Sequence, residues 1–172
     1  MPSTTFDHLS TEKKARVTAA LLTEFSEHSL AEAQVARIVT TAGIARGAFY
    51  KYFADLTDAY QYLYRLALRD IHRDAGGDER QHFDADRIYQ GVVAFVDRVN
   101  DSQYYDLIRR HYAENESLLP ATPVAPQLPV LAWAAMVLSH AAIKEILLQP
   151  ANEAAVCERL RTTLDRLQPK GV

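Results

Sequence analysis

The sequence predicts an all-α fold of about eight or nine helices, and three observations support this prediction. Apolar residues recur three and four positions apart along most of the 172 residues, without the alternation typical of strands. Serine, aspartate and asparagine stand where helices would begin, and glycine or proline where they would end. Hydrophobic residues make up 48% and charged residues 24% of the chain, which is ordinary for a protein with a substantial core.

The first helix is expected to begin after Ser10, a favourable N-cap with Glu12 in the first helical turn. Apolar residues then follow at a spacing of about four: Val17, Ala20, Leu21 and Phe25. Such a stripe would cover the next two helices.

The segment Gln34 to Phe53 is expected to form two short helices joined by a turn at Gly43. Gly43 stands where a helix C-terminus requires a positive φ, which only glycine adopts at little cost. Two helices of this length around a tight turn fit a helix-turn-helix. They fit an ordinary helical hairpin equally well, and the pattern alone leaves both interpretations open.

Three further helices are predicted before residue 120. The first is capped by Asp55 and runs to about residue 74, and the polar stretch Gly76 to Asp84 then marks a boundary between a small head and a larger body. Asp84 or Asp86 caps the next helix, and Gln103 to Asn115 forms another.

The C-terminal part begins with four prolines at every third residue: Pro120, Pro123, Pro126 and Pro129. They predict an extended, rigid connection rather than a ligand for a proline-reading domain, with Pro129 close to a helix start. Val130 to Gln149 forms a helix that is apolar nearly all round, and a last helix with a narrower seam follows Asn152. This favours a symmetric dimer through the two helices, with a fully intramolecular core as the alternative.

The cysteine content is compatible with a reducing compartment. The single cysteine, Cys157, excludes an intramolecular disulfide framework and is expected to be a small buried residue rather than a sensor thiol. The N-terminus lacks the features of a signal peptide, and the apolar run Val130 to Ile143 is too short to span a bilayer. We therefore expect a cytoplasmic protein with no membrane partner.

The net charge of −3 requires any binding of nucleic acid to be local. Residues 1–54 hold six Lys or Arg against five Asp or Glu, whereas the remainder holds 13 against 17. This difference has the sign expected for a DNA-binding head on an acidic body, but it is small.

The N-terminal residues match a family pattern. The matching residues are Val17, Ala20, Leu21, Phe25, Ile38, Val39, Ala42, Gly43, Ile44, Gly47, Phe49, Tyr50 and Phe53. In this order and spacing they resemble the N-terminal domain of TetR/AcrR-type transcriptional regulators, over roughly Thr11 to Leu68. The resemblance implies a helix-turn-helix DNA-binding domain at 10–54 and a connecting helix at 55–75. It also implies a helical domain for effector binding and dimerisation at 84–168.

The resemblance further implies a homodimer whose second motif helix enters the major groove of double-stranded DNA. Ala45 to Lys51 would form the recognition region, with Arg46 contacting a base or phosphate. Tyr50 and Lys51 would meet backbone phosphates, and Gly47 would allow a close approach. Gln34 would bond a phosphate or an adenine.

Three residues depart from the family pattern. Gln34 and Ala45 replace the usual capping Ser or Thr at the starts of the two motif helices, and Leu56 replaces a frequent Lys at the start of the following helix. Each change removes a cap or a phosphate contact, so operator affinity is expected to be modest.

An effector pocket is expected in the larger body, whose sequence contains aromatic and polarisable side chains. The candidates are Tyr104, Ile108, His111, Tyr112, Trp133, Met136 and His140. The last three share one helical face, and packing in the core is the alternative role for all seven. The effector would be an unknown small molecule, with an apolar or aromatic compound the least surprising.

No catalytic motif is present in the sequence. The six glycines form neither a dinucleotide-binding pattern nor a phosphate loop, and nucleophile-elbow and zinc-protease motifs are absent. The pairs His28/Glu32 and His111/Glu114 have helical ligand spacing, but such pairs are common. We expect no enzyme activity, no metal and no cofactor.

The sequence therefore predicts a TetR-like regulator, in particular a repressor that binds a palindromic operator as a homodimer and is released by a small-molecule effector. The alternative is a helical protein of the same ancestry that has lost operator binding and acts through a protein partner.

Overall fold

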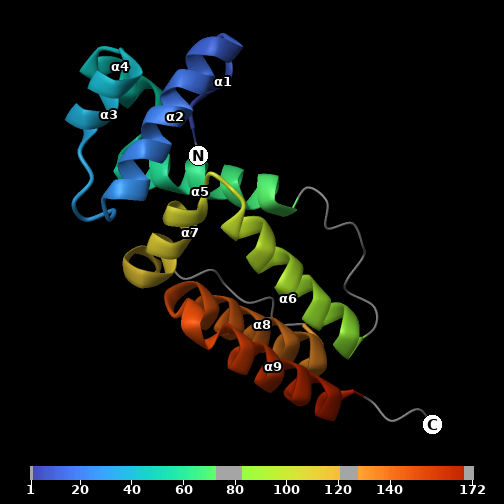
Figure 1. Cartoon of the computed structure of the whole chain (residues 1–172). Coiled ribbons are helices and arrows are strands. Elements are labelled where there is room, and N and C mark those ends of the chain that lie inside the picture. Colours follow the sequence, from blue (N-terminus) through green and yellow to red (C-terminus); the bar gives the residue numbers. More distant parts are fainter. Residues whose placement is uncertain (1, 73–82, 121–127, 169–172) are drawn as a thin grey trace. The chain divides into compact units, whose positions relative to one another are not determined.

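The computed structural model describes residues 2–72, 83–120 and 128–168, and all regular structure within them is helical, as predicted (Figure 1). The α-helices are α1 (Thr4–Asp7), α2 (Thr11–Glu27), α3 (Val35–Ala42), α4 (Arg46–Tyr52), α5 (Leu56–His72), α6 (Ala85–Asn100), α7 (Tyr105–Arg110), α8 (Val130–Leu148) and α9 (Glu153–Leu167). His111–Asn115 continues α7 as a π-helix, and Glu116–Leu118 and Pro150–Asn152 are short 3-10 turns.

Most helix starts lie where the capping residues predict them. The Ser10 hydroxyl accepts the Lys13 N–H at the start of α2, and an oxygen of the Asp55 carboxylate accepts the Asp58 N–H at 2.7 Å at the start of α5. Asp84, rather than Asp86, caps α6 through the Arg87 N–H.

Packing divides the chain into two units, each with its own core. The first combines α1 to α4 and most of α5 with the segment Gln103–Pro120, and the second contains α6, α8 and α9. Gly76 to Asp84, the predicted boundary, lies outside the described residues apart from Phe83 and Asp84, and so do Pro123 and Pro126. The predicted domain ranges remain a prediction.

The core of the first unit forms on the stripe of α2. Val17, Leu21 and Phe25 are fully buried, and the Phe25 ring meets that of Tyr60 edge-on at 5.1 Å. Because α3 packs on α2, and α4 on α3, the two helices of the turn motif share this core (Figure 1).

The segment predicted as one helix from Gln103 to Asn115 differs from the prediction. It begins at Tyr105 and widens into a π-helix at His111. Both ends of the π-helix are buried, and the Asn115 side-chain oxygen accepts the Leu30 N–H at 2.8 Å. Such π-helical turns inside α-helices are rare and occur frequently at functional sites.

The second unit is a bundle of three helices in which α6, α8 and α9 pack pairwise. Val92, Phe95 and Val99 of α6 are buried, and α9 contributes its predicted seam through Val156, Leu160 and Leu164. Pro129 occupies the N-cap of α8, as the proline pattern predicted. Asn152 stands at the N-cap of α9, but its side-chain amide bonds Gln149 instead of capping the helix.

Candidate nucleic-acid interface

The turn between α3 and α4 has the predicted geometry. Gly43 ends α3 in the left-handed conformation, with φ of 63° and ψ of 42°. Ile44 N–H donates to the Val39 carbonyl at 3.0 Å, and Gly43 N–H to that of Thr40 at 3.2 Å. These bonds satisfy carbonyls at the helix end and direct the chain into α4.

Helix α4 separates its residues into a buried and an exposed face. Phe49 is fully buried and Tyr52 is 4% exposed, which fixes the helix on the core of the first unit. Its other face carries the four expected DNA-contacting residues of this helix, all exposed: Arg46, Gly47, Tyr50 and Lys51. At 100° per residue these four span roughly 140° of the helix circumference.

Arg46 and Tyr50 lie one turn apart on this exposed face. The Arg46 guanidinium is 6.0 Å from the centre of the Tyr50 ring, and the Tyr50 side chain is 51% exposed. A cation and a hydroxyl are thus presented together, which suits a phosphate or a base edge.

Gly47 is not required by the packing of the protein. A Cβ built at this position would meet no atom within 4 Å. The reason for a glycine here, if it is functional, has to come from something outside the unit.

The N-terminal ends of α3 and α4 lack side-chain caps, as the departures from the family pattern predicted. Gln34 and Ala45 occupy the N-cap positions of α3 and α4, and neither makes a capping bond through its side chain. Both residues are exposed, and Leu56 is half-buried at the start of α5.

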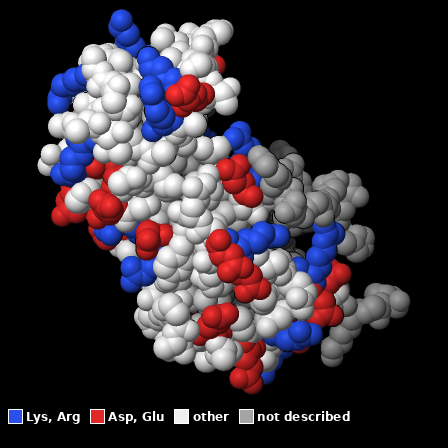
Figure 2. Space-filling model, turned by 45° about the horizontal axis from the view of Figure 1, so that its top comes forward, with Lys and Arg blue, Asp and Glu red and all other residues white. Residues whose placement is uncertain are grey.

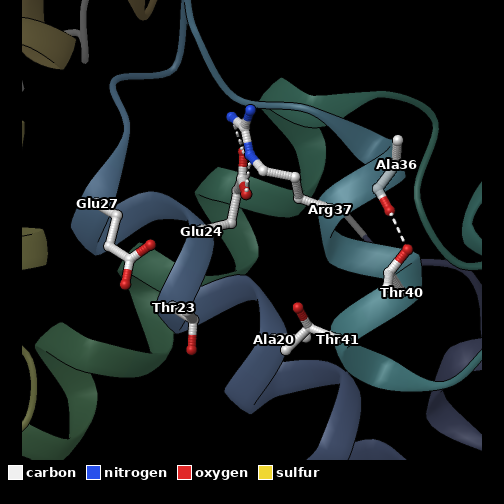
Figure 3. Close-up of a pocket in the computed structure, with 8 residues that line it drawn as sticks. All are labelled: Ala20, Thr23, Glu24, Glu27, Ala36, Arg37, Thr40 and Thr41. Carbon is white, nitrogen blue, oxygen red and sulfur yellow. Dashed lines mark hydrogen bonds and ion pairs between the residues drawn. The ribbon is translucent and has the colours of Figure 1, made fainter.

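A carboxylate on α2 supports the start of α3 instead. Glu24 is 4% exposed, and its Oε1 accepts the backbone N–H of Gln34 and an Nη2 proton of Arg37, both at 2.6 Å (Figure 3). Arg37 also donates to the Glu32 carbonyl at 2.9 Å. The pair lines an open hollow of about 340 Å³ between α2 and α3, together with Thr40 and other small side chains.

The bonds to Glu24 outweigh the cost of burying its charge. Burial alone would raise the pKa of the Glu24 carboxyl, but the bonds from Arg37 and the Gln34 N–H hold it below its ordinary value of 4.5. This ion pair was not predicted from the sequence. A charged residue four positions after Ala20, within an apolar stripe, was the signal that could have indicated it.

Basic side chains are prominent over the N-terminal helices on the face shown in Figure 2, where acidic side chains also occur. Two of the basic residues on α2 lie against aromatic rings, Lys13 at 6.0 Å from Tyr52 and Lys14 at 5.2 Å from Phe6. Residues 1–54, which include α4, carry a small excess of one positive charge on a chain whose net charge is −3.

Four of the seven residues expected to bind an effector belong to the first unit. Tyr104, Ile108 and His111 are buried, and Tyr112 is half-buried. His111 Nδ1 is 3.0 Å from the Tyr60 hydroxyl.

Two of these tyrosines have raised pKa values. Burial, with the Asp70 carboxylate as hydrogen-bond partner at 2.8 Å, raises the pKa of Tyr104 to about 12. Burial, with the nearby charge of Glu116, raises that of Tyr112 to about 12. Both phenols are neutral at physiological pH, so each is able to donate a hydrogen bond.

The other three expected effector residues lie on α8 in the second unit. Trp133 is 49% exposed, His140 is exposed and Met136 is half-buried. Cys157 on α9 is half-buried, and burial together with Glu153 raises the pKa of its thiol, which disfavours the reactive thiolate.

Comparisons with known proteins agree with this geometry. The profile of the family described as bacterial regulatory proteins, tetR family, matches residues 17–56, which run from α2 to the start of α5. No curated protein matches the chain. In fold, the chain is similar to the crystal structure of a TetR family transcriptional regulator from Chloroflexus aurantiacus J-10-FL. That similarity has a TM-score of 0.53 at 20% identity and covers 98% of this chain and 97% of the other.

Helices α2 to α4 thus form a helix-turn-helix DNA-binding domain, which is a kind of domain found in regulators of transcription. Residues 17–56 therefore match the DNA-binding domain of the tetR family, and the fold of the whole chain is similar to that of a TetR family transcriptional regulator.

Proposed function

We propose that this regulator is a cytoplasmic repressor that binds a palindromic operator as a homodimer and is released by a small-molecule effector. The observation that carries the proposal is the exposed face of α4, where Arg46, Gly47, Tyr50 and Lys51 are presented by a helix whose other face is buried.

Each residue of this face has a distinct role in the proposal. The fork of Arg46 bonds a guanine edge or a phosphate, and the Tyr50 hydroxyl and the Lys51 ammonium bond phosphates. Gly47 permits close approach, which is consistent with the open space around it. Gln34 and Ala45 lie exposed at the N-caps of α3 and α4, where the Gln34 side chain bonds a phosphate or an adenine in this proposal.

The exposed apolar surface of α8 supports the proposed dimer. This helix of 19 residues is long and apolar enough, by length and composition, to cross a membrane, yet only 28% of its most apolar window is buried. The helix extends beyond the apolar run Val130 to Ile143, which by itself is too short to span a bilayer. Val130, Trp133 and Val137 are 78%, 49% and 43% exposed and follow one another at helical spacing.

A second copy of the chain is the occupant that we propose for this face. Because α8 packs on α6 and α9 through Ala135, Ile143 and Ile146, one side of it already belongs to a protein core. A membrane would surround a spanning helix, whereas a two-fold related copy covers the remaining apolar side alone.

Release by an effector follows from the geometry of a palindrome. Two α4 helices fit successive half-sites when their separation is one helical turn of DNA, ~34–36 Å. An effector that binds better to a dimer with another separation shifts the population away from the DNA-binding form. Tyr104, Ile108, His111 and Tyr112 in the first unit, and Trp133, Met136 and His140 in the second, remain separate candidates for effector contacts.

The proposal is tested by selection of duplexes from a random-sequence DNA pool with the wild-type protein. We expect enriched sequences with two inverted half-sites centred about one helical turn apart. Analytical ultracentrifugation should give twice the chain mass of 19.3 kDa. A monomer, or a protein that enriches no sequence at low salt, would contradict the proposal, and the second result would favour action through a protein partner.

A further inference from the structure

The chain before α2 contains an ordered segment that the sequence analysis did not predict. Residues Thr4–Asp7 form α1, and the Ser3 hydroxyl caps it by accepting the Phe6 N–H at 3.3 Å. Phe6 is fully buried although it stands in a short polar stretch of sequence. This segment precedes residues 17–56, which match the family profile.

Ser3 satisfies the carboxyl end of α4. Its backbone N–H donates to the Tyr52 carbonyl at 2.9 Å, and its hydroxyl donates to the Lys51 carbonyl. Both carbonyls belong to the last turn of α4, where a helix has no internal donors left. The Ser3 hydroxyl is thereby used twice, as acceptor within α1 and as donor to α4.

The Phe6 ring packs against aromatic rings at the same end of α4. The Phe6 ring centre lies 4.9 Å from that of Phe53, 5.7 Å from that of Tyr52 and 5.0 Å from that of Tyr62. Tyr62 belongs to α5, and its hydroxyl is 3.2 Å from Thr18 Oγ1 on α2. Phe6 therefore connects the end of α4 to two longer helices.

Phe49 and Tyr52 hold helix α4 on the core, but the helix contributes little to its own stability. It is seven residues long, it carries Gly47 at its second position, and Ala45 gives it no side-chain cap. A helix of this length is not stable alone, so its contacts with the rest of the unit determine where its exposed face points.

We propose that the segment Ser3 to Phe6 is a clasp that positions the DNA-reading helix, with Ser3 and Phe6 as positioning residues. This inference rests on the proposed role of α4 in reading DNA. Without the clasp, a smaller fraction of the protein holds α4 in the orientation that fits the groove. The apparent affinity for the operator then falls in proportion to that fraction.

The clasp acts on specific binding more than on general attraction to DNA. Contacts to base edges require an exact position of α4, whereas phosphate attraction depends mainly on the number of charges. Removing the Ser3 hydroxyl changes no charge. A shuffled duplex should therefore bind equally well before and after the change.

The test compares Ser3→Ala with Ser3→Thr in the full chain with its own N-terminus and no tag before it. The probes are a duplex enriched by the wild type from random-sequence DNA and a shuffled duplex of the same composition. We expect Ser3→Ala to weaken binding to the enriched duplex about fivefold, as the loss of one or two hydrogen bonds implies. Ser3→Thr, which keeps a hydroxyl, should bind as the wild type does, and the shuffled duplex should not distinguish the three proteins.

Two further variants separate positioning from a general loss of stability. Phe6→Ala removes the ring from the clasp, whereas Leu107→Ala removes a fully buried side chain of α7 in the same unit. Both should lower Tm, but well below Tm only Phe6→Ala should weaken binding to the enriched duplex. Equal binding by Ser3→Ala and the wild type, or equal loss from Phe6→Ala and Leu107→Ala, would overturn the inference.

Hydrogen exchange tests the clasp without DNA. In Ser3→Ala, the amides of residues 46–53 should exchange faster than in the wild type, while those of residues 156–164 in α9 should not change. Unchanged exchange over 46–53 would refute the clasp. Failure of the wild type to enrich any duplex would count against the proposed repressor function instead, and the exchange experiment would still decide the inference.

Discussion

Helices α4 and α8 expose opposite kinds of surface. Helix α4 buries Phe49 and Tyr52 completely or nearly so and leaves Arg46, Tyr50 and Lys51 in solvent. The nineteen residues of α8 bury part of an apolar surface and leave Val130, Trp133 and Val137 exposed.

The difference shows what each helix needs from outside the chain. A polar and cationic face suits the phosphates and base edges of DNA, whereas an exposed apolar stripe is stabilised when another apolar surface covers it. One chain therefore presents two incomplete surfaces, and the proposed operator complex completes both.

The largest expected effect comes from a charge on the apolar stripe. Val137→Glu should convert the dimer into a monomer of 19.3 kDa, because a carboxylate would be buried without a partner at the two-fold interface. Operator affinity should then fall on the order of 100-fold, since the two half-sites are no longer bound together.

The matched control for this experiment is Gln90→Glu, which adds the same charge at an exposed position of α6. It should leave both mass and affinity unchanged. A dimer that survives Val137→Glu would show that α8 exposes its apolar side for another reason.

A smaller effect is expected at the ion pair that supports α3. Glu24→Gln should lower the free energy of unfolding by about 1–3 kcal/mol at neutral pH, because a charged hydrogen-bond partner of Arg37 is lost. The folded-state pKa of Glu24 lies below its ordinary value of 4.5, so this stabilisation is fully present above that value. It is lost as the pH falls through the lower folded-state pKa.

Denaturant unfolding at several pH values measures this prediction. The difference between the wild type and Glu24→Gln should shrink as the pH falls below 4.5, whereas Glu27→Gln, an exposed neighbour on the same hollow, should differ little from the wild type at any pH. A constant difference across this range would mean that the ion pair does not hold the carboxyl in its charged form.

The smallest expected change in stability concerns two glycines. Gly47→Ala and Gly91→Ala both place a methyl group in open space on a helix, so each should raise the free energy of unfolding by up to about 1 kcal/mol. Only Gly47→Ala should weaken operator binding, because only there does the proposed complex bring DNA close to the helix. If the two variants bind DNA equally well, close approach at Gly47 is not part of recognition.

The sequence predicted those parts of the fold that depend on neighbouring residues. The stripe of α2, the positive φ of Gly43 and the proline at the start of α8 all follow from local spacing and from the conformational limits of single residues. The exposed face of α4 followed from the same spacing.

Contacts between residues far apart in the sequence could not be predicted from such patterns. Ser3 and Lys51 are 48 positions apart, Glu24 and Arg37 are on different helices, and His111 meets Tyr60 across 51 positions. The π-helix at His111–Asn115, whose end residues bond Tyr60 and Leu30, was not predicted either. A pattern with a period of 3.6 residues records which face is buried, but not which polar groups meet there.

The central claim is that the exposed face of α4 reads DNA, and the double variant Arg46→Ala with Tyr50→Phe tests it most directly. Both side chains are exposed, so unfolding should be unchanged, while affinity for the enriched duplex should fall about 10- to 100-fold. Arg87→Ala with Tyr89→Phe, on α6, makes the same chemical changes in the second unit and should bind as the wild type does. Unchanged binding by the α4 variant would contradict the assignment of this helix.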